Sequence, residues 1–388
     1  MPPFPDILPF LFWMGTALVV YTYGIYPAVI WVLSTIFSRH RAIPAERDHD
    51  LPTVSLLIAA HNEESVIAER LENAVSSDYP SDKLDIVVAS DGSRDRTIAI
   101  VREFAERGVR LLDYKQNRGK AAVLNAAFEE VTAEIVVLSD ANTGTNPSAI
   151  RKLVRWFQDP DVGIVCGRLI LTDPRTGRNV DSMYWKYETF LKKCESRLGG
   201  LLGANGGIYA VRRKLFRPIA PNTIVDDLVL PLSIKLTTGC EIVYDAEAIA
   251  HEETPATIAS EFARRCRIGA GDFQSIPVLW RLLNPAQGWI AFTFFSHKVL
   301  RWLCPFFLAG ILVINVLLLD KPLYQLTLAL QIALYTTAAI GSSFSGAGVI
   351  GRSIRLTTLF TTVNLALLVG FWRWISGPQR GSWERTAR

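Results

Sequence analysis

Two oxygen-bearing side chains end an apolar segment in the stretch Asp140-Ala141-Asn142. Mg²⁺ and Mn²⁺ prefer oxygen ligands and commonly use one or two carboxylates together with substrate phosphates. Asp140 can ligate such a cation directly, and the amide oxygen of Asn142 can ligate more weakly or through water. A loop that is capped for structural reasons has the same sequence, so both interpretations stay open.

A second acidic turn, SDGSRD, carries Asp91 at the end of another apolar segment. Gly92 permits a sharp turn after it. In a nucleotide site, the Asp91 carboxylate would accept a hydrogen bond from a base edge. The alternative is an ordinary Asp-Gly turn in which Asp95 caps the next helix.

Two adjacent carboxylates, Asp226 and Asp227, precede an apolar helical pattern at Leu228, Leu232 and Leu236. Acidic residues stabilise the first turn of a helix. They can equally supply a general base, because one carboxylate can hold the other near its working pKa.

Three arginines lie within four residues of each other: Arg264, Arg265 and Arg267. A diphosphate needs several cationic donors, and arginine offers bidentate ones. The alternative is a solvated basic face close to lipid headgroups.

Strand-like and helical patterns alternate around these residues. Helical patterns are expected from His61, after Ser93 and over about 119–131, and apolar strands over 54–60, 84–90, 109–113 and 135–139. This alternation predicts a largely parallel sheet with helices on both faces.

Ligands of such sheets bind outside the carboxyl ends of the strands. His61, Asn62, Asp91 and Asp140 all fall there. The turn after the first strand, AAHNEE, contains no glycine, and the chain has no GxxxxGK[ST] loop. A dinucleotide-binding fold and a phosphate loop are therefore excluded.

Four runs without Asp, Glu, Lys or Arg indicate membrane segments. The chain is 49% hydrophobic, and the uncharged runs cover residues 7–38, 302–319, 322–351 and 356–372. A bilayer span needs roughly 20 apolar residues. We expect a multi-pass protein of the plasma (inner) membrane.

Basic residues set the expected orientation. Arg39, Arg41 and Arg47 follow the first run, whereas Asp6 precedes it, so the middle of the chain should be cytoplasmic. Four spans would place the arginines of the C-terminal tail outside. Either the tail is an exception, or one segment is re-entrant or interfacial.

The remaining composition excludes several classes. The net charge of +4 is modest, and no basic stripe is interleaved with aromatic residues, so no nucleic acid partner is expected. The five cysteines form no CxxC pair, which argues against a zinc site or a disulfide framework.

The order of the motifs resembles that of processive, membrane-bound members of glycosyltransferase family 2. The resemblance covers essentially the whole chain and rests on the segments VSLLIAAHNEE, SDGSRD, NRGKAAVLNAA, SDAN, GANGGIYAVRR, VDDL and RRCRI. It implies an α/β fold of the GT-A type, with a mixed, mostly parallel sheet flanked by transmembrane helices. The expected domains are a membrane anchor with a basic linker (1–50), a cytoplasmic catalytic domain (51–285), and an interfacial segment with about three transmembrane helices (286–388).

The resemblance also implies roles for individual residues. Asp227 would be the catalytic base beside Asp226, Gly206 and Gly207 would border the acceptor, and Asp140 and Asn142 would hold Mg²⁺ or Mn²⁺. The nucleotide-sugar donor, expected to be a UDP-sugar, would be bound by Ala60, His61, Asn62, Glu63, Asp91, Lys120, Asp140, Arg264, Arg265 and Arg267.

Two positions depart from the family pattern. Asn142 stands where the metal motif usually ends in Asp. In the motif Gln-x-x-Arg-Trp, Arg264 replaces the Gln and Ile268 replaces the Trp. The second departure weakens the case for processive polymer synthesis.

Three functions follow as hypotheses. The first is inverting transfer of a hexose or N-acetylhexosamine to a growing exopolysaccharide or lipid-linked glycan, with membrane lipids and export or polymerisation subunits as partners. The second is a single transfer to a membrane lipid. The third, which rests on Asn142, is a catalytically silent sugar-nucleotide sensor or assembly subunit.

Overall fold

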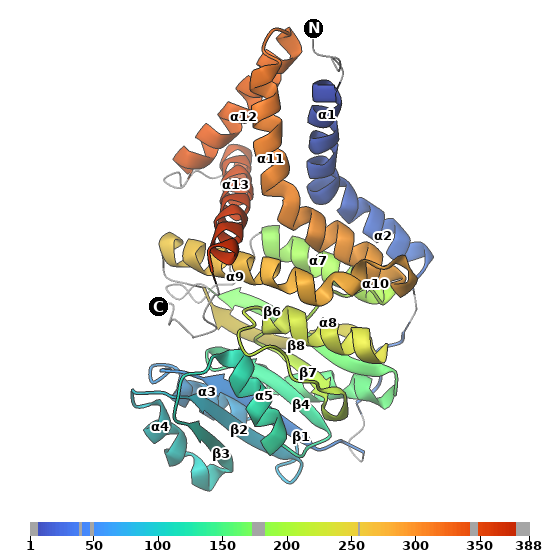
Figure 1. The fold of residues 1–388 in the computed structure, drawn as a ribbon. Coiled ribbons are helices and arrows are strands. Elements are labelled where there is room, and N and C mark those ends of the chain that lie inside the picture. Colours follow the sequence, from blue (N-terminus) through green and yellow to red (C-terminus); the bar gives the residue numbers. More distant parts are fainter. Residues whose placement is uncertain are drawn as a thin grey trace. The chain divides into compact units, whose positions relative to one another are not determined.

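The computed structural model describes residues 7–38, 41–46, 50–172, 183–254, 257–341 and 348–377 (Figure 1). The contacts divide the described residues into two compact units. The larger comprises residues 30–261 and 274–293, and the smaller comprises 7–29, 262–273 and 294–377. The boundaries expected at residues 50 and 285 stay a prediction.

An eight-stranded mixed sheet forms the centre of the larger unit, with the strand order β3-β2-β1-β4-β7-β6-β8-β5. Four of its seven pairings are parallel and three are antiparallel. The strands are β1 (Val54–Ala60), β2 (Leu84–Asp91), β3 (Val109–Tyr114), β4 (Ile135–Asp140), β5 (Thr143–Thr145), β6 (Val162–Thr172), β7 (Tyr209–Arg212) and β8 (Glu241–Glu253).

Helices cover both faces of this sheet. Leu56 and Ile58 of β1 pack in one cluster with Leu71 and Leu153 from two helices. Leu57 is equally buried and points to the opposite face because side chains alternate along a strand, and α5 packs on β1 and β2. The helices are α3 (Ile67–Val75), α4 (Thr97–Glu103), α5 (Lys120–Glu130), α6 (Ala149–Val154), α7 (Met183–Leu198) and α8 (Asp226–Thr238).

The strand directions bring distant parts of the sequence to one edge of the sheet. Strands β1, β2 and β4 are parallel, so their carboxyl ends lie together. Strand β7 is antiparallel to both β4 and β6, and β8 is parallel to β6. The carboxyl end of β8 therefore lies at the same edge as that of β4.

The four predicted strands are confirmed to within one residue, but the helix expected at His61 begins only at Ile67. The intervening backbone amides bond to the neighbouring loop instead of to a helical turn. The amide of Asn62 donates to Ser93 Oγ, and that of Glu63 donates to Thr97 Oγ1. Residues 61–64 are thereby fixed against the turn after β2.

Four helical stretches are long and apolar enough to cross a membrane: Ile7–Ile36, Trp289–Leu317, Pro322–Gly341 and Gly348–Ile375. They contain α1 (Ile7–Val20), α2 (Tyr26–Ile36), α10 (Trp289–Thr293), α11 (Leu300–Leu317), α12 (Pro322–Gly341) and α13 (Gly348–Ile375), and α9 (Ile258–Leu279) precedes the second stretch.

Two helical stretches have other bounds than the uncharged runs of the sequence, and where the chain enters a membrane stays a prediction. The second stretch begins at Trp289 rather than at residue 302, because Lys298 and Arg301, which interrupt the apolar run in the sequence, lie inside the helical stretch. The third run was predicted to continue to residue 351, but Gly348 already begins the next helix.

Polar side chains within the smaller unit are paired between helices, as helix packing in a lipid environment favours. The Asn364 amide donates to the Tyr23 hydroxyl at 3.1 Å. The Asn315 side chain is fully buried and lies 2.7 Å from the Thr327 hydroxyl.

Candidate active site

The loop after β1 is held by a hydrogen-bond network that also fixes the state of His61. Its Nε2 lies 3.1 Å from the side-chain nitrogen Nδ2 of Asn62 and 3.0 Å from Nδ2 of Asn117. Amide nitrogens donate, so Nε2 accepts and Nδ1 carries the proton. Nδ1 then donates to the backbone carbonyl of Asp91 at 2.7 Å. Ala60, the last residue of β1, is fully buried behind this loop.

Asp91 is completely buried at the end of β2, and both of its carboxylate oxygens are engaged. Oδ1 accepts from the Arg118 amide and Oδ2 from the Gly119 amide, each at 2.8 Å. Gly92 has φ +65°, and a Cβ there would lie 2.7 Å from the Asn117 amide nitrogen. Asp91 therefore anchors the segment that leads into α5. Its expected contact with a base stays a prediction.

Lys120 bridges two carboxylates from different elements. Its Nζ lies 2.7 Å from Oδ1 of Asp140, at the end of β4, and 3.3 Å from Oδ2 of Asp226, at the start of α8. The three side chains expose 22%, 25% and 7% of their area. This edge of the sheet thus holds an ion cluster that is partly closed to solvent.

The cluster changes the protonation of its members. Burial raises the pKa of Asp226 to about 6, although Lys120 opposes that shift. Burial also disfavours the charged form of Lys120, but the carboxylates of Asp140 and Asp226 outweigh it and hold the lysine pKa above its ordinary value. Lys120 is therefore a cation at neutral pH.

Gly206 lies near two carboxylates with different expected roles: Asp140, on the donor side, and Asp227, which would act on the acceptor. A Cβ at Gly206 would lie 3.5 Å from Asp140 Oδ2 and 3.5 Å from Asp227 Oδ2. The backbone carbonyl of Asp227 accepts from the Ala204 amide at 2.8 Å, which ties this glycine loop to α8. A larger side chain at Gly206 would fill the space between the carboxylates.

The oxygen donors at this edge fit a divalent cation. Asp140 Oδ2 points toward the glycine loop, and Asn142 is two residues away. Among the described residues, no three His, Cys, Asp or Glu side chains form a metal-binding group. A Mg²⁺ or Mn²⁺ ion here would therefore need substrate phosphates or water as further ligands, which is its ordinary habit.

Sequence reasoning missed three polar side chains at this edge. The hydroxyls of Tyr209 and Thr143 are buried and have no hydrogen-bond partner among the described residues. Burial and the carboxylates of Asp226 and Asp227 raise the Tyr209 pKa. The third is Glu252, whose Oε1 accepts from Asn142 Nδ2 at 3.1 Å. Unpaired buried hydroxyls are rare enough to require an explanation. The sequence around Tyr209 and Thr143 shows only a tyrosine and a threonine in strands, which does not predict a functional site.

The structure brings most of the predicted residues together at one edge of the larger unit. Gly207 is among them, because a Cβ there would lie 2.9 Å from Thr143 Oγ1. Arg264, Arg265 and Arg267 belong to α9 within the smaller unit. Their expected contact with the donor stays a prediction.

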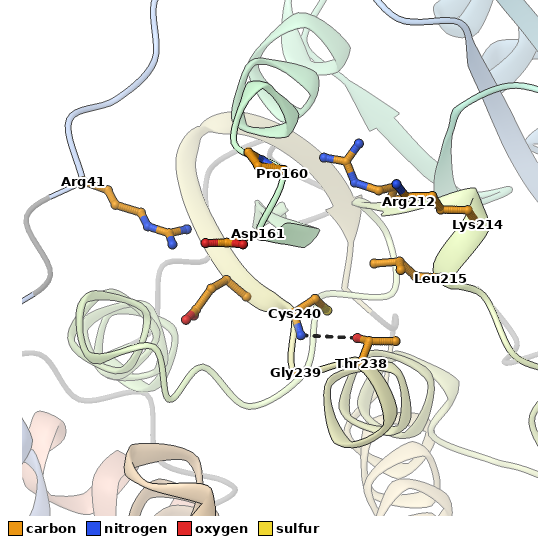
Figure 2. A pocket seen from close by; sticks show the side chains of 10 residues that line it. Arg41, Pro160, Asp161, Arg212, Lys214, Leu215, Thr238, Gly239 and Cys240 are labelled. Atoms are coloured by element: carbon orange, nitrogen blue, oxygen red, sulfur yellow. Dashed lines mark hydrogen bonds between the residues drawn. The ribbon is translucent and has the colours of Figure 1, made fainter.

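A separate cavity of about 430 Å³ lies at the opposite edge of the sheet (Figure 2). Arg212, which lines it, pairs with the first residue of β4, whereas Asp140 is the last. The Arg212 guanidinium donates to the carbonyls of Phe157 and Val162, so this cation is used in the fold. Cys240 also lines the cavity, and burial raises its thiol pKa.

Known proteins share this sequence pattern and fold. Residues 55–219 match the model of glycosyl transferase family 2. A poly-beta-1,6-N-acetyl-D-glucosamine synthase of Staphylococcus epidermidis is 25% identical over 270 residues, which cover 64% of this chain and 63% of the synthase. A beta-monoglucosyldiacylglycerol synthase of Trichormus variabilis is 26% identical over 273 residues, which cover 66% of this chain and 56% of that protein.

A solved structure has the same architecture. The mannosyltransferase PcManGT of Pyrobaculum calidifontis, in complex with GDP-Man and Mn²⁺, aligns with a TM-score of 0.71 and 22% identity over 94% of this chain and 99% of that chain. The predicted GT-A type of fold is thereby confirmed. The similarity to the two synthases above, by contrast, spans less than two thirds of the length of each synthase.

Proposed function

Because this chain belongs to glycosyl transferase family 2, we propose that it transfers a sugar from a nucleotide-sugar, expected to be a UDP-sugar, to a growing exopolysaccharide or lipid-linked glycan. The sugar would be a hexose or an N-acetylhexosamine, and the anomeric configuration would invert. The supporting observation is the cluster of Lys120, Asp140 and Asp226 beside Asp227 and the glycine loop. In this cluster Lys120 would bind a diphosphate, and the nearby Asp227 carboxylate would act on the hydroxyl group of the acceptor.

Asp227 would remove the proton from the attacking acceptor hydroxyl as that oxygen bonds to the anomeric carbon. General base catalysis by a positioned carboxylate contributes about 10²–10⁴-fold in rate. The space beside Gly206 would admit the acceptor, since a Cβ there would come within 3.5 Å of the Asp227 carboxylate. The loop at His61 and Glu63 would bind the nucleotide, and the arginines of α9 would contact its diphosphate.

Asp140 and Asn142 would hold Mg²⁺ or Mn²⁺. When bound, such an ion supplies positive charge that stabilises the departing diphosphate. Lys120 would stand beside the same phosphates, and removing one group of this kind typically costs a few kcal/mol in the barrier.

The four apolar helical stretches associate the chain with a membrane. We place the catalytic unit on the cytoplasmic side, because Arg41 follows the first stretch and the positive-inside rule then applies. Export or polymerisation subunits would be further partners in the plasma membrane.

The test is nucleotide release by detergent-purified protein across a panel of UDP-sugars and GDP-mannose, with Mn²⁺, with Mg²⁺ and with EDTA. We expect release with one donor, lost in EDTA. No release with any donor, from folded protein with membrane lipids added, would contradict the proposal and favour the sensor hypothesis.

A single transfer to a membrane lipid is the second candidate. Ile268 stands where the family motif has Trp, and one matched relative is named as a synthase of a glucosyldiacylglycerol. The mass of the product decides between the two. A ladder of sugar additions indicates a polymer, and one discrete glycolipid indicates a single transfer.

A further inference from the structure

The side chain of Asn142 is held by Glu252, a residue from the other end of the catalytic unit's sequence. Asn142 Nδ2 donates to Glu252 Oε1 at 3.1 Å. The backbones of β5 and β8 place these residues together, since Thr143 is the strand partner of Glu252. Because β8 runs in the same direction as β4, Glu252 lies at the edge that carries Asp140.

The chemistry of the pair fixes the orientation of the amide. An ionised carboxylate only accepts hydrogen bonds, so the nitrogen of Asn142 must face Glu252. The carbonyl oxygen Oδ1 is consequently directed away from Glu252. Without this bond, the amide could rotate and present either atom.

The charge of the pair is also informative. Asn142 and Glu252 together carry one negative charge, which equals the charge of a single Asp at position 142. The adjacent hydroxyl of Thr143 is fully buried and has no hydrogen-bond partner among the described residues. An unpaired buried hydroxyl calls for an explanation, and a bound ion or other polar ligand is one.

We infer that Glu252 is a positioning residue of the divalent metal site: it directs the Asn142 oxygen to the cation and supplies the negative charge that position 142 lacks. The inference rests on the proposed function, because the cation is the cofactor expected there. Partners of this kind orient metal ligands, and their loss typically weakens metal affinity 10–100-fold.

The test is a titration of purified protein and UDP with Mn²⁺, in which electron paramagnetic resonance measures the free ion. Glu252→Gln should weaken Mn²⁺ binding at least about 10-fold. Glu253→Gln is the matched control, because it removes the same charge from the next residue of β8, whose side chain points to the other face. It should change the affinity less than twofold.

A charge swap separates positioning from mere folding. Asn142→Asp alone adds a second carboxylate to the site and does not isolate positioning, so the double variant is compared with Glu252→Gln. Asn142→Asp combined with Glu252→Gln restores one charge and one hydrogen bond, and should return the affinity to within about threefold of the unmodified chain.

Three results would overturn the inference. These are an affinity unchanged in Glu252→Gln, a double variant no better than Glu252→Gln, or no Mn²⁺ binding by the unmodified chain. The last result would leave glycosyl transfer intact if nucleotide release persists in EDTA, so a failure of this inference is distinguishable from a failure of the proposed function.

Discussion

Lys120 and Asp140 form an ion pair whose atoms, Nζ and Oδ1, lie 2.7 Å apart. The same ammonium group lies 3.3 Å from Asp226 Oδ2. One cation thus pairs with two carboxylates that arrive from β4 and from α8. Without it, two negative charges would face each other with little solvent between them.

Replacing Lys120 by Met should therefore destabilise the metal-free protein. Removing one partner of a buried pair costs about 3–5 kcal/mol, and we expect about 3 kcal/mol because the lysine keeps some exposure. Mn²⁺ should recover part of this loss, since it supplies the missing positive charge. Thermal unfolding with and without MnCl₂ measures both effects.

Lys115→Met is the matched control for this variant. Lys115 pairs with Asp113 but its side chain is 79% exposed, so its loss should change stability by less than about 1 kcal/mol. If Mn²⁺ raises the melting temperature of Lys120→Met no more than that of the unmodified chain, the lysine does not stand in for a metal charge.

Tyr209 and Tyr79 form a matched pair of buried tyrosines. The Tyr79 hydroxyl donates to the Pro52 carbonyl at 2.6 Å, whereas the Tyr209 hydroxyl has no hydrogen-bond partner among the described residues. Tyr79→Phe should lower the free energy of unfolding by about 1 kcal/mol, and Tyr209→Phe should leave it unchanged or raise it. Chemical unfolding measures both, and a larger loss in Tyr209→Phe would show that its hydroxyl is paired.

Much of this fold was predictable because strand and helix patterns in the first half are local and strong. Strand β1 is apolar at every position but Ser55 since it is buried on both faces, and β4 ends at Asp140, one residue beyond its predicted end. Because ligands of parallel sheets bind at the carboxyl ends of the strands, these strands then identified the edge at which His61, Asp91 and Asp140 lie.

The missed features depend on pairings between distant segments. Asn142 and Glu252 are 110 residues apart, and only the antiparallel pairing of β5 with β8 joins them. The helix expected at His61 failed for the same reason, because the Asn62 amide bonds to Ser93 in another loop. No periodicity in either segment reports such a partner.

His251 should make stability depend on pH. Burial lowers its pKa below the ordinary value of about 6.5, so the unfolded chain takes up a proton before the folded one does. The contribution of His251 to the free energy of unfolding is therefore complete above about pH 6.5. It is lost as the pH falls through the lower pKa of the folded state. The melting temperature of His251→Gln should fall less between pH 7.5 and pH 5.5 than that of the unmodified chain. Parallel curves would contradict this assignment.

The most direct test of the central claim is the turnover of Asp227→Asn. We predict that nucleotide release falls at least about 100-fold while calorimetry finds the donor affinity within about threefold of the unmodified chain. Glu72→Gln, which alters an exposed ion pair on α3, is the control and should keep full turnover. Turnover of Asp227→Asn within tenfold of the unmodified chain would contradict the assignment of Asp227 as the catalytic base.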